Sequence, residues 1–426
     1  MSGNRIQYDV EDELSSLTDV TTNWIIDHAD QFDPLEPEPS RAISARRKAF
    51  SELGLALMVR SSYASVEPTL HELVTERASD SDYYGLLRRY PRQVIRFANP
   101  LLYAADADKL SPEALAALQE AFERECVWNT ERPAYERLQL LHQSILAPGV
   151  EPRQRPEEVV SRSFIERPPN VVTAEAKAAY QLTHDVFFAS NVGRRSEGFR
   201  STSAGERLRS TVVGLLARSM AREQTDLTIE LLAAGSIERA LPQGVIAAGL
   251  DWLQDRTTDG KLPGPDMSDA SDTSVSHGDL SVLDPPLRHW AEHYHTNLTA
   301  AFLLPVVREY IDEAPHCASI DREQYRDSLC TLGDAVDALS NYELRSGAQS
   351  LRSVGTDGPD VFEDVIQECL AYLRMQRQAD GSYGHWWDKR VVLRQRTDAS
   401  VDVQSLTDPI AAECTKTIEA LGGENG

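Results

Sequence analysis

Lysine is scarce in this sequence. Only six of the 426 residues are lysine, whereas 37 are arginine, and the acidic residues bring the formal net charge to −24. A chain this acidic repels the phosphates of nucleic acids and of anionic membrane surfaces, so we expect neither as a partner. Its carboxylate-rich composition resembles that of proteins from salt-loving archaea.

Cysteine pairs, leader sequences and long apolar runs are missing as well. The five cysteines are odd in number and widely spread, with no C-x-x-C pair, which predicts a cytoplasmic protein without a disulfide framework. The N-terminal stretch MSGNRIQYDVEDELSS is polar and acidic and predicts no signal peptide. No apolar run approaches the length of a membrane span, so we expect a soluble protein.

What the sequence does have is helical periodicity. The stretches 52–63, 111–128, 174–191 and 203–223 place apolar residues at i, i+3 or i+4, and i+7. Ser111 followed by Pro112 is a typical helix start, with a cap and then proline at the first helical position. Because no alternating strand pattern of useful length occurs, we predict an all-α protein.

Two segments interrupt this pattern. Residues 147–159 are proline-rich and charged, as linkers are, so we predict an N-terminal helical region over 1–150 and a second unit over 151–426. Residues 264–286 are rich in serine and aspartate, and we expect an exposed, flexible insertion there.

A weak internal repeat indicates the architecture of the second unit. LDWLQDRTTDGKLPG (250–264) and LAYLRMQRQADGSYG (370–384) align with one gap, and in each an amphipathic helix runs into an Asp-Gly turn. Glycine accepts the positive φ that stops a helix, and a new helix is predicted after each turn. This pattern predicts helical hairpins stacked into a toroid-like array.

The second copy, MQRQADGSYG, resembles the Gln-x-x-Asp-Gly-Ser-Trp-Gly turns of the α/α-toroid enzymes, with Tyr383 at the tryptophan position. These enzymes are the terpene and squalene cyclases and the β-subunits of protein prenyltransferases. The resemblance implies an α/α toroid. It does not imply cyclase chemistry, because the Asp-x-Asp-Asp acid motif of the terpene cyclases is missing.

Two other stretches, YQLTHDVFFASNVG (180–193) and YHTNLTAAF (294–302), are similar to an uncharacterised bacterial and archaeal helical family. That family carries Leu-Thr-His-x-x-Phe-Phe and Tyr-His-Thr-x-Leu. Its usual Thr-Asp-Phe-Gly stands here as Ser190-Asn191-Val192-Gly193, so the acid is replaced by an amide. The resemblance implies no established function.

Histidines cluster in HWAEHYH, residues 289–295. His289 and His293 are four residues apart, so on a helix both could bind one ion. HWAEH also matches the H-x-x-E-H pattern of zinc peptidases, in which Glu292 would be the general base. The alternative is an exposed helix start, because two prolines directly precede this stretch.

His295 lies on the opposite face of such a helix, and this face continues into apolar residues. His184 also lies on an apolar face, together with Tyr180 and Phe187. Two inward histidines could meet at the centre of a ring. Alternatively, each is a core histidine hydrogen-bonded to a carbonyl or carboxylate.

Asp226 is the acid that could join His184 and His295, since one carboxylate and two imidazoles suit Zn²⁺ or Fe²⁺. It also opens the stretch DLTIELLAAGS, where aspartate ordinarily caps a helix. We therefore keep both interpretations, a catalytic or metal-binding residue and a cap.

The aromatic residues predict an apolar pocket beside these groups. Tyr180 and Phe187, together with Tyr383 and Trp386 from YGHWWDKR (383–390), would line it. A hydrophobic plug near the C-terminal helices is the alternative for YGHWWDKR.

Together these observations favour an enzyme whose central cavity binds its substrate. We expect a small or peptidyl substrate that has an apolar part. Its candidate catalytic or metal-binding residues are His184, His295 and Asp226. Two alternatives stay open: a non-catalytic helical binding or scaffold protein, and a zinc hydrolase built on His289, His293 and Glu292.

Overall fold

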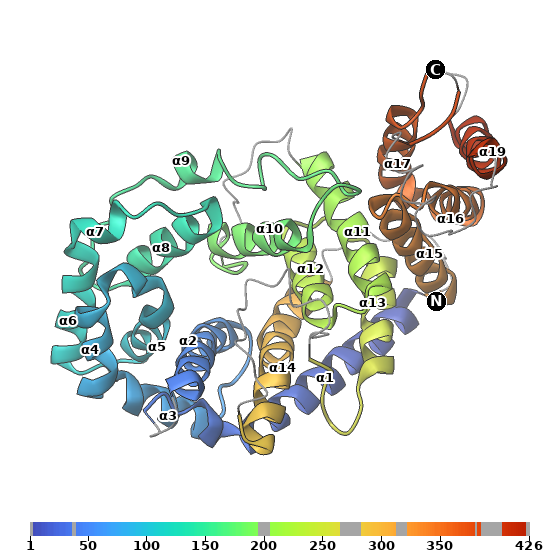
Figure 1. The fold of residues 1–426 in the computed structure, drawn as a ribbon. Helices are drawn as coiled ribbons and strands as arrows, with labels where there is room; N and C mark the ends of the chain where they lie inside the picture. The colour runs from blue at the N-terminus through green and yellow to red at the C-terminus, as the bar shows by residue number, and fades with distance from the viewer. Residues whose placement is uncertain are drawn as a thin grey trace.

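The protein is all-α, as predicted (Figure 1). The computed structural model describes residues 3–35, 40–194, 205–264, 283–311, 322–379, 381–384 and 403–422. Within these ranges no strand is present, and two isolated β-bridges close short turns. No helix in them is long and apolar enough to cross a membrane. Most of the predicted insertion, 264–286, lies outside the described residues.

The N-terminal part of the chain combines long and short helices. The predicted start at Ser111 is confirmed, because Ser111 Oγ accepts a hydrogen bond from the backbone N–H of Ala114 at 3.3 Å. In chain order the helices are α1 (Gly3–Asp27), η1 (Ala29–Phe32), α2 (Ser40–Tyr63), α3 (Pro68–Ala78), α4 (Ser81–Arg89), η2 (Pro91–Gln93), α5 (Val94–Asp106), α6 (Pro112–Glu123), α7 (Glu125–Trp128), α8 (Ala134–Leu146) and α9 (Pro156–Val160).

The rest of the chain is built from longer helices. Those predicted to follow the two Asp-Gly turns are present as α14 and α19. In chain order the helices are α10 (Ala176–Ala189), α11 (Gly205–Ala221), α12 (Thr225–Ile237), α13 (Gln243–Arg256), α14 (Pro285–Tyr310), α15 (Arg322–Ser340), α16 (Leu344–Asp357), η6 (Asp360–Phe362), α17 (Glu363–Met375) and α19 (Val403–Leu421).

Six helices form a closed circuit of packing contacts, which we call the six-helix ring. In it α2 packs against α14, α14 against α12, α12 against α10, α10 against α8, α8 against α5, and α5 against α2 again. Figure 1 shows these helices arranged around one centre. Three of them precede residue 150, so the ring crosses the predicted boundary between 1–150 and 151–426.

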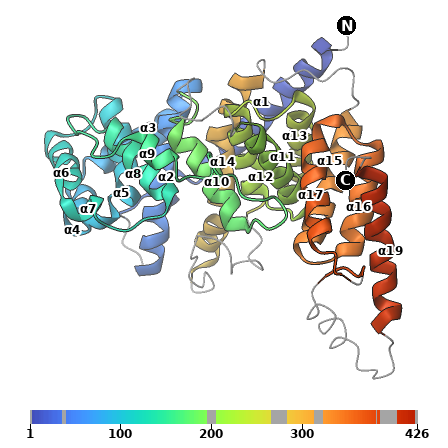
Figure 2. The same ribbon diagram turned by 90° about the horizontal axis from the view of Figure 1, so that it is seen from above.

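The C-terminal helices lie beside the ring. Figures 1 and 2 show α15, α16, α17 and α19 grouped at one end of the molecule. This group meets the remainder through α11 and α13, which pack against α15, and through the contact of α11 with α17.

Two clusters of buried apolar side chains stabilise the described structure. One is built mainly from residues 24–147 and includes the face of α14 that carries Trp290 and Tyr294. Phe32 meets the Trp290 ring edge-on, with centroids 5.4 Å apart. The other extends from α8 to α19 and also takes in residues of α1. Burial of apolar surface across both halves of the chain therefore holds the ring together.

The repeat appears as two tight turns after α13 and α17. Gly260 and Gly381 both have positive φ, +72° and +81°. In the first turn Thr258 and Lys261 exchange two backbone hydrogen bonds, and in the second Arg377 and Tyr383 form a bridge. The predicted glycine conformation is confirmed at both positions, whereas Asp380 lies outside the described residues.

Helices α2 and α5 approach each other closely at Gly54. A Cβ atom added there would lie 2.5 Å from the backbone nitrogen of Pro100, which is inside α5. Only a residue without a side chain allows this distance between two helix backbones.

Candidate functional site

Polar side chains join α10 to α12 within the six-helix ring. The hydroxyl of Tyr180 donates to Asp226 Oδ2 at 2.5 Å, and the hydroxyl of Thr183 donates to Glu230 Oε2 at 2.6 Å. Asp226 and Glu230 are four residues apart, so both lie on one face of α12. Since both acids are buried, these bonds hold two carboxyl groups away from bulk solvent.

His184 lies on α10 beside this acid pair. Its Nδ1 donates to the carbonyl oxygen of Tyr180 at 2.7 Å and lies 3.8 Å from Glu230 Oε2. With a proton held on Nδ1, Nε2 is the accepting nitrogen of the neutral ring. The side chain is 35% exposed, and no hydrogen bond to Nε2 is found among the described contacts.

Aromatic rings surround His184. Tyr135 of α8 and Phe188 each lie with ring centroids 5.9 Å from that of His184, and Phe187 lies at 6.3 Å. An imidazole in such surroundings suits a ligand that carries an apolar group next to its polar one.

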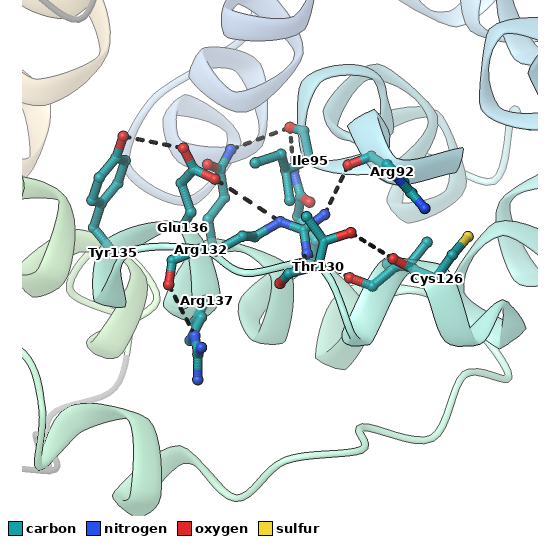
Figure 3. Close-up of polar contacts among 11 residues, drawn as sticks. Arg92, Ile95, Cys126, Thr130, Arg132, Tyr135, Glu136 and Arg137 are labelled. Atoms are coloured by element: carbon teal, nitrogen blue, oxygen red, sulfur yellow. Dashed lines mark hydrogen bonds and ion pairs between the residues drawn. The ribbon is translucent and has the colours of Figure 1, made fainter. Parts of the chain in front are cut away.

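Figure 3 shows the polar contacts around Arg132 and Tyr135. The buried guanidinium of Arg132 donates to the carbonyl oxygens of Arg92, at 2.8 Å, and of Thr130, at 3.3 Å. Tyr135 itself donates to Glu136 Oε1 at 3.3 Å. The Arg132 bonds hold the segment that leads into α8 against η2, and Tyr135, in the first turn of α8, contacts the His184 ring of α10.

The turn after α10 is also held by α8. Asn191 and Val192 have positive φ, +52° and +50°, a conformation that is rare for a β-branched residue. His142 Nε2 lies 2.6 Å from Asn191 Oδ1, and the Tyr63 hydroxyl donates to the carbonyl oxygen of Val192 at 2.8 Å. The amide that replaces the expected acid therefore serves as the partner of His142.

A second charged group joins α2 to α14. His295 Nδ1 lies 3.5 Å from Glu52 Oε2, and Lys48 Nζ lies 3.5 Å from Glu52 Oε1. Both nitrogens and Oε2 are shielded from solvent. A carboxylate therefore lies between an ammonium group and an imidazole in a largely desolvated place.

These neighbours shift the pKa values of both partners. Burial by itself would raise the pKa of the Glu52 carboxyl, but the charges of Lys48 and His295 outweigh it and lower this pKa to about 2. Burial by itself would lower the pKa of His295, but the Glu52 carboxylate outweighs it and the pKa is raised. Both shifts favour a charged pair.

Glu230 interacts electrostatically with a histidine of each group, His184 and His295. Burial raises the pKa of its carboxyl, and the positive charges of His184 and His295 oppose that rise. Both imidazoles therefore lie within electrostatic reach of one buried carboxyl. A buried acid with a raised pKa close to a histidine is common at functional sites.

The structure thus brings the sequence-predicted residues His184, His295 and Asp226 together around Glu230. It does not gather them as metal ligands, because their ligand atoms do not form a close group among the described residues. Asp226 does not cap α12 either, since its side chain makes no capping bond and accepts from Tyr180 instead. Its Oδ1 is shielded from solvent and makes no hydrogen bond within the described structure.

The H-x-x-E-H residues lie elsewhere on α14. His289 is exposed, and Glu292 and His293 are half-buried. One ligand atom from each of them lies within 4.8 Å of the others, which makes them the one such group in the described ranges. Burial is the main cause of the lowered pKa of His293, and it favours the neutral ring.

The predicted pocket residues do not all lie in one place. Tyr180 and Phe187 lie beside His184. Tyr383 is buried in the turn after α17, where Gly384 N donates to the carbonyl oxygen of Gln376 at 2.9 Å. Helix α17 packs against α11, α16 and α19, so Tyr383 belongs to the C-terminal helices. Trp386 lies outside the described residues.

Sequence reasoning missed Lys48, Glu52 and Glu230. A signal for them exists, because two helices each contribute a polar pair at i and i+4. Glu230 follows Asp226 by four residues in an otherwise apolar stretch, and Glu52 follows Lys48 by four. On α12, which is buried all round, such a pair indicates a partner on a neighbouring helix.

The family model for the domain of unknown function DUF6895 matches residues 18–304. The chain belongs to this family. The DUF6895 match takes in α2, α5, α8, α10 and α12 whole and most of α14, so the six-helix ring falls almost entirely within it. The C-terminal helices α15 to α19 follow the match. No curated protein and no solved structure matches the chain.

Proposed function

We propose that this DUF6895 protein is an enzyme that uses His184 as a general acid and base. The observation that carries this proposal is the contact between His184 Nδ1 and Glu230 Oε2, 3.8 Å apart. The bond to the Tyr180 carbonyl holds the proton on Nδ1 and supports Nε2 as the base. When Nε2 takes a proton from a substrate, the Glu230 carboxylate stabilises the imidazolium that forms.

The neighbouring groups support distinct roles. Thr183 orients Glu230 through a 2.6 Å hydrogen bond. The pKa of Tyr180 is raised well above its ordinary value, mainly by burial and further by Asp226, so its hydroxyl stays a donor. The rings of Tyr135 and Phe187 favour a small or peptidyl substrate with an apolar part.

A divalent metal is not needed for this proton transfer, and the donor set of the proposed site fits one poorly. The Nδ1 atoms of both central histidines already face a carbonyl or carboxylate oxygen. One carboxylate oxygen of Asp226 and one of Glu230 already accept from hydroxyl groups. We therefore propose that zinc or iron, if the enzyme uses one, binds away from His184.

Hydrolysis of p-nitrophenyl acetate tests the proposal, since this ester reports a reactive imidazole without knowledge of the natural substrate. The wild-type chain is compared with His184→Gln, Glu230→Gln and His28→Gln. His28 is the matched control, because its Nδ1 makes the same bond to the i−4 carbonyl, at 2.8 Å from Trp24 O.

We expect the first two variants to lose at least about tenfold in rate and the control to keep the wild-type rate. Equal rates in all four proteins, or no acceleration by the wild type, would contradict the enzyme and favour a binding or scaffold protein. Circular dichroism of each variant confirms that the comparison is made on folded chains.

A further inference from the structure

We propose that the outer side of α14 holds a separate binding site for a divalent transition-metal ion, with Zn²⁺ as the best fit. Its ligands are His289, Glu292 and His293, whose ligand atoms lie within 4.8 Å of one another. Two imidazoles and one carboxylate are a ligand set that suits zinc and neighbouring transition metals. Three protein ligands leave at least one coordination position for water or substrate.

The hydrogen bonds of the site already orient one ligand. His293 Nδ1 donates to the carbonyl oxygen of His289 at 2.8 Å. This bond holds the proton on Nδ1 and leaves the lone pair of Nε2 for a metal ion, as the outer hydrogen bond of a metal-bound histidine ordinarily does. The His289 and His293 rings lie 4.4 Å apart and are tilted by 42°.

Small side-chain rotations complete the geometry. Ligand atoms around a tetrahedral zinc ion are about 3.3 Å apart, as follows from zinc–nitrogen bonds of about 2.0–2.1 Å. Since the ligand atoms lie within 4.8 Å of one another, each separation needs to close by at most about 1.5 Å. None of the three side chains is held by a salt bridge among the described contacts. His289 is exposed, so it has room to rotate.

The helix that carries the site is held by contacts on two sides. Trp290 and Tyr294 are buried and stack with ring centroids 4.9 Å apart. On another side Asn297 accepts from the backbone N–H of Leu262 at 3.0 Å and donates to the carbonyl oxygen of Leu262 at 3.1 Å. A ligand set on a helix held in this way needs little ordering when the ion binds.

Two nearby features act on a cation bound at this position of α14. Asp284 is at the N-cap position and Pro285 begins the helix. The positive end of the helix dipole opposes a cation most strongly in the first turn, and His289 lies beyond that turn. Lys261 lies within electrostatic reach of His293 and opposes a cation there. Removal of the Lys261 charge should therefore strengthen metal binding, a result specific to this site.

The test is isothermal titration of the chelator-treated, full-length protein with ZnCl₂. We expect the wild type to bind zinc and His289→Ala, His293→Ala and Glu292→Gln each to lose this binding or weaken it by at least about tenfold. His28→Ala is the matched histidine control and should titrate as the wild type does. Lys261→Gln should bind zinc more tightly than the wild type.

Three results would overturn the proposal: no zinc uptake by the wild type, wild-type titration curves for His289→Ala and His293→Ala, or loss of zinc in His184→Gln with retention in His289→Ala. The last result would indicate that the ion binds at His184 in the six-helix ring. Replacement of zinc by Co²⁺ adds a second readout, because a bound tetrahedral ion gives visible absorption that the three ligand variants should lack. Neither titration depends on ester hydrolysis, so this site and the proposed His184 chemistry can fail independently.

Discussion

His295 on α14 faces Glu52 on α2, with its Nδ1 3.5 Å from Glu52 Oε2. The two residues come from opposite halves of the chain, and their contact lies where the six-helix ring closes between α14 and α2. Lys48 meets the other oxygen of the same carboxylate at 3.5 Å. One carboxylate thus contacts two basic groups at the junction of the two halves.

Removal of the Glu52 charge should destabilise the protein. In Glu52→Gln, Lys48 and His295 stay shielded from solvent without their counter-charge, and we expect the free energy of unfolding at pH 6 to fall by roughly 1–3 kcal/mol. Urea unfolding measures this change. Glu120→Gln is the matched control: Glu120 pairs with Arg124 and Arg88 on the surface, and its loss should stay within about 0.5 kcal/mol.

The effect of Glu52 should depend on acid pH. Its pKa is lowered from 4.5 to about 2 in the folded protein, so the carboxylate contributes its stabilisation above about pH 4.5 and loses it as the pH falls towards 2. The difference between wild type and Glu52→Gln should therefore shrink over that range. A difference that stays constant from pH 6 to pH 3 would contradict the charged pair.

NMR titration of the histidine side chains tests the effect of Glu52 on the pKa of His295. We expect the pKa of His295 to lie above 6.5 in the wild type and below 6.5 in Glu52→Gln, where burial acts without the carboxylate. The stabilisation from protonated His295 is present below pH 6.5 and is lost as the pH rises through its raised folded value. An unchanged His295 titration in the variant would show that Glu52 is not its partner.

Asp185 should weaken the fold as it ionises. Burial raises its pKa to about 7, and the backbone N–H of Phe164, which donates to Oδ2 at 2.8 Å, only partly opposes this rise. Stability therefore falls as the pH rises from the ordinary value of 3.8 through 7.

In Asp185→Asn the amide oxygen can still accept from Phe164, and no buried charge forms. We expect this variant to gain on the order of 2 kcal/mol over the wild type at pH 8, and nothing at pH 4. Thermal or urea unfolding at the two pH values measures the gain. Lower stability of the variant at pH 8 would mean that the ionised carboxylate is stabilised by groups other than Phe164.

Gly54 and Gly85 should respond to alanine in opposite directions. Both are inside helices, but a Cβ at Gly54 would lie 2.5 Å from Pro100 N, whereas a Cβ at Gly85 would meet nothing within 4 Å. We expect Gly54→Ala to cost about 2 kcal/mol or more, because two helix backbones must move apart. Gly85→Ala should stabilise by about 0.5–1 kcal/mol through helix propensity. Similar unfolding midpoints for both variants would contradict the close approach of α2 and α5.

The sequence by itself determined the local features of this protein. Helical periodicity predicted the all-α fold, Ser111 marked the start of α6, and Gly260 and Gly381 marked left-handed turns. Each of these depends on interactions between residues only a few positions apart, such as a cap, a turn or one helical face. For the same reason the i, i+4 spacing placed His289 and His293 together on α14.

Only the tertiary structure decided which helix faces meet. The contact of Glu52 with His295, the contact of Glu230 with His184, and a ring formed by helices on both sides of residue 150 all depend on packing between distant segments. Helical periodicity shows that a face is buried, but many apolar faces are chemically alike, so the pattern does not identify the partner. The partner follows from shape, as at Gly54 against Pro100, and from the need to pair buried charges once the helices have met.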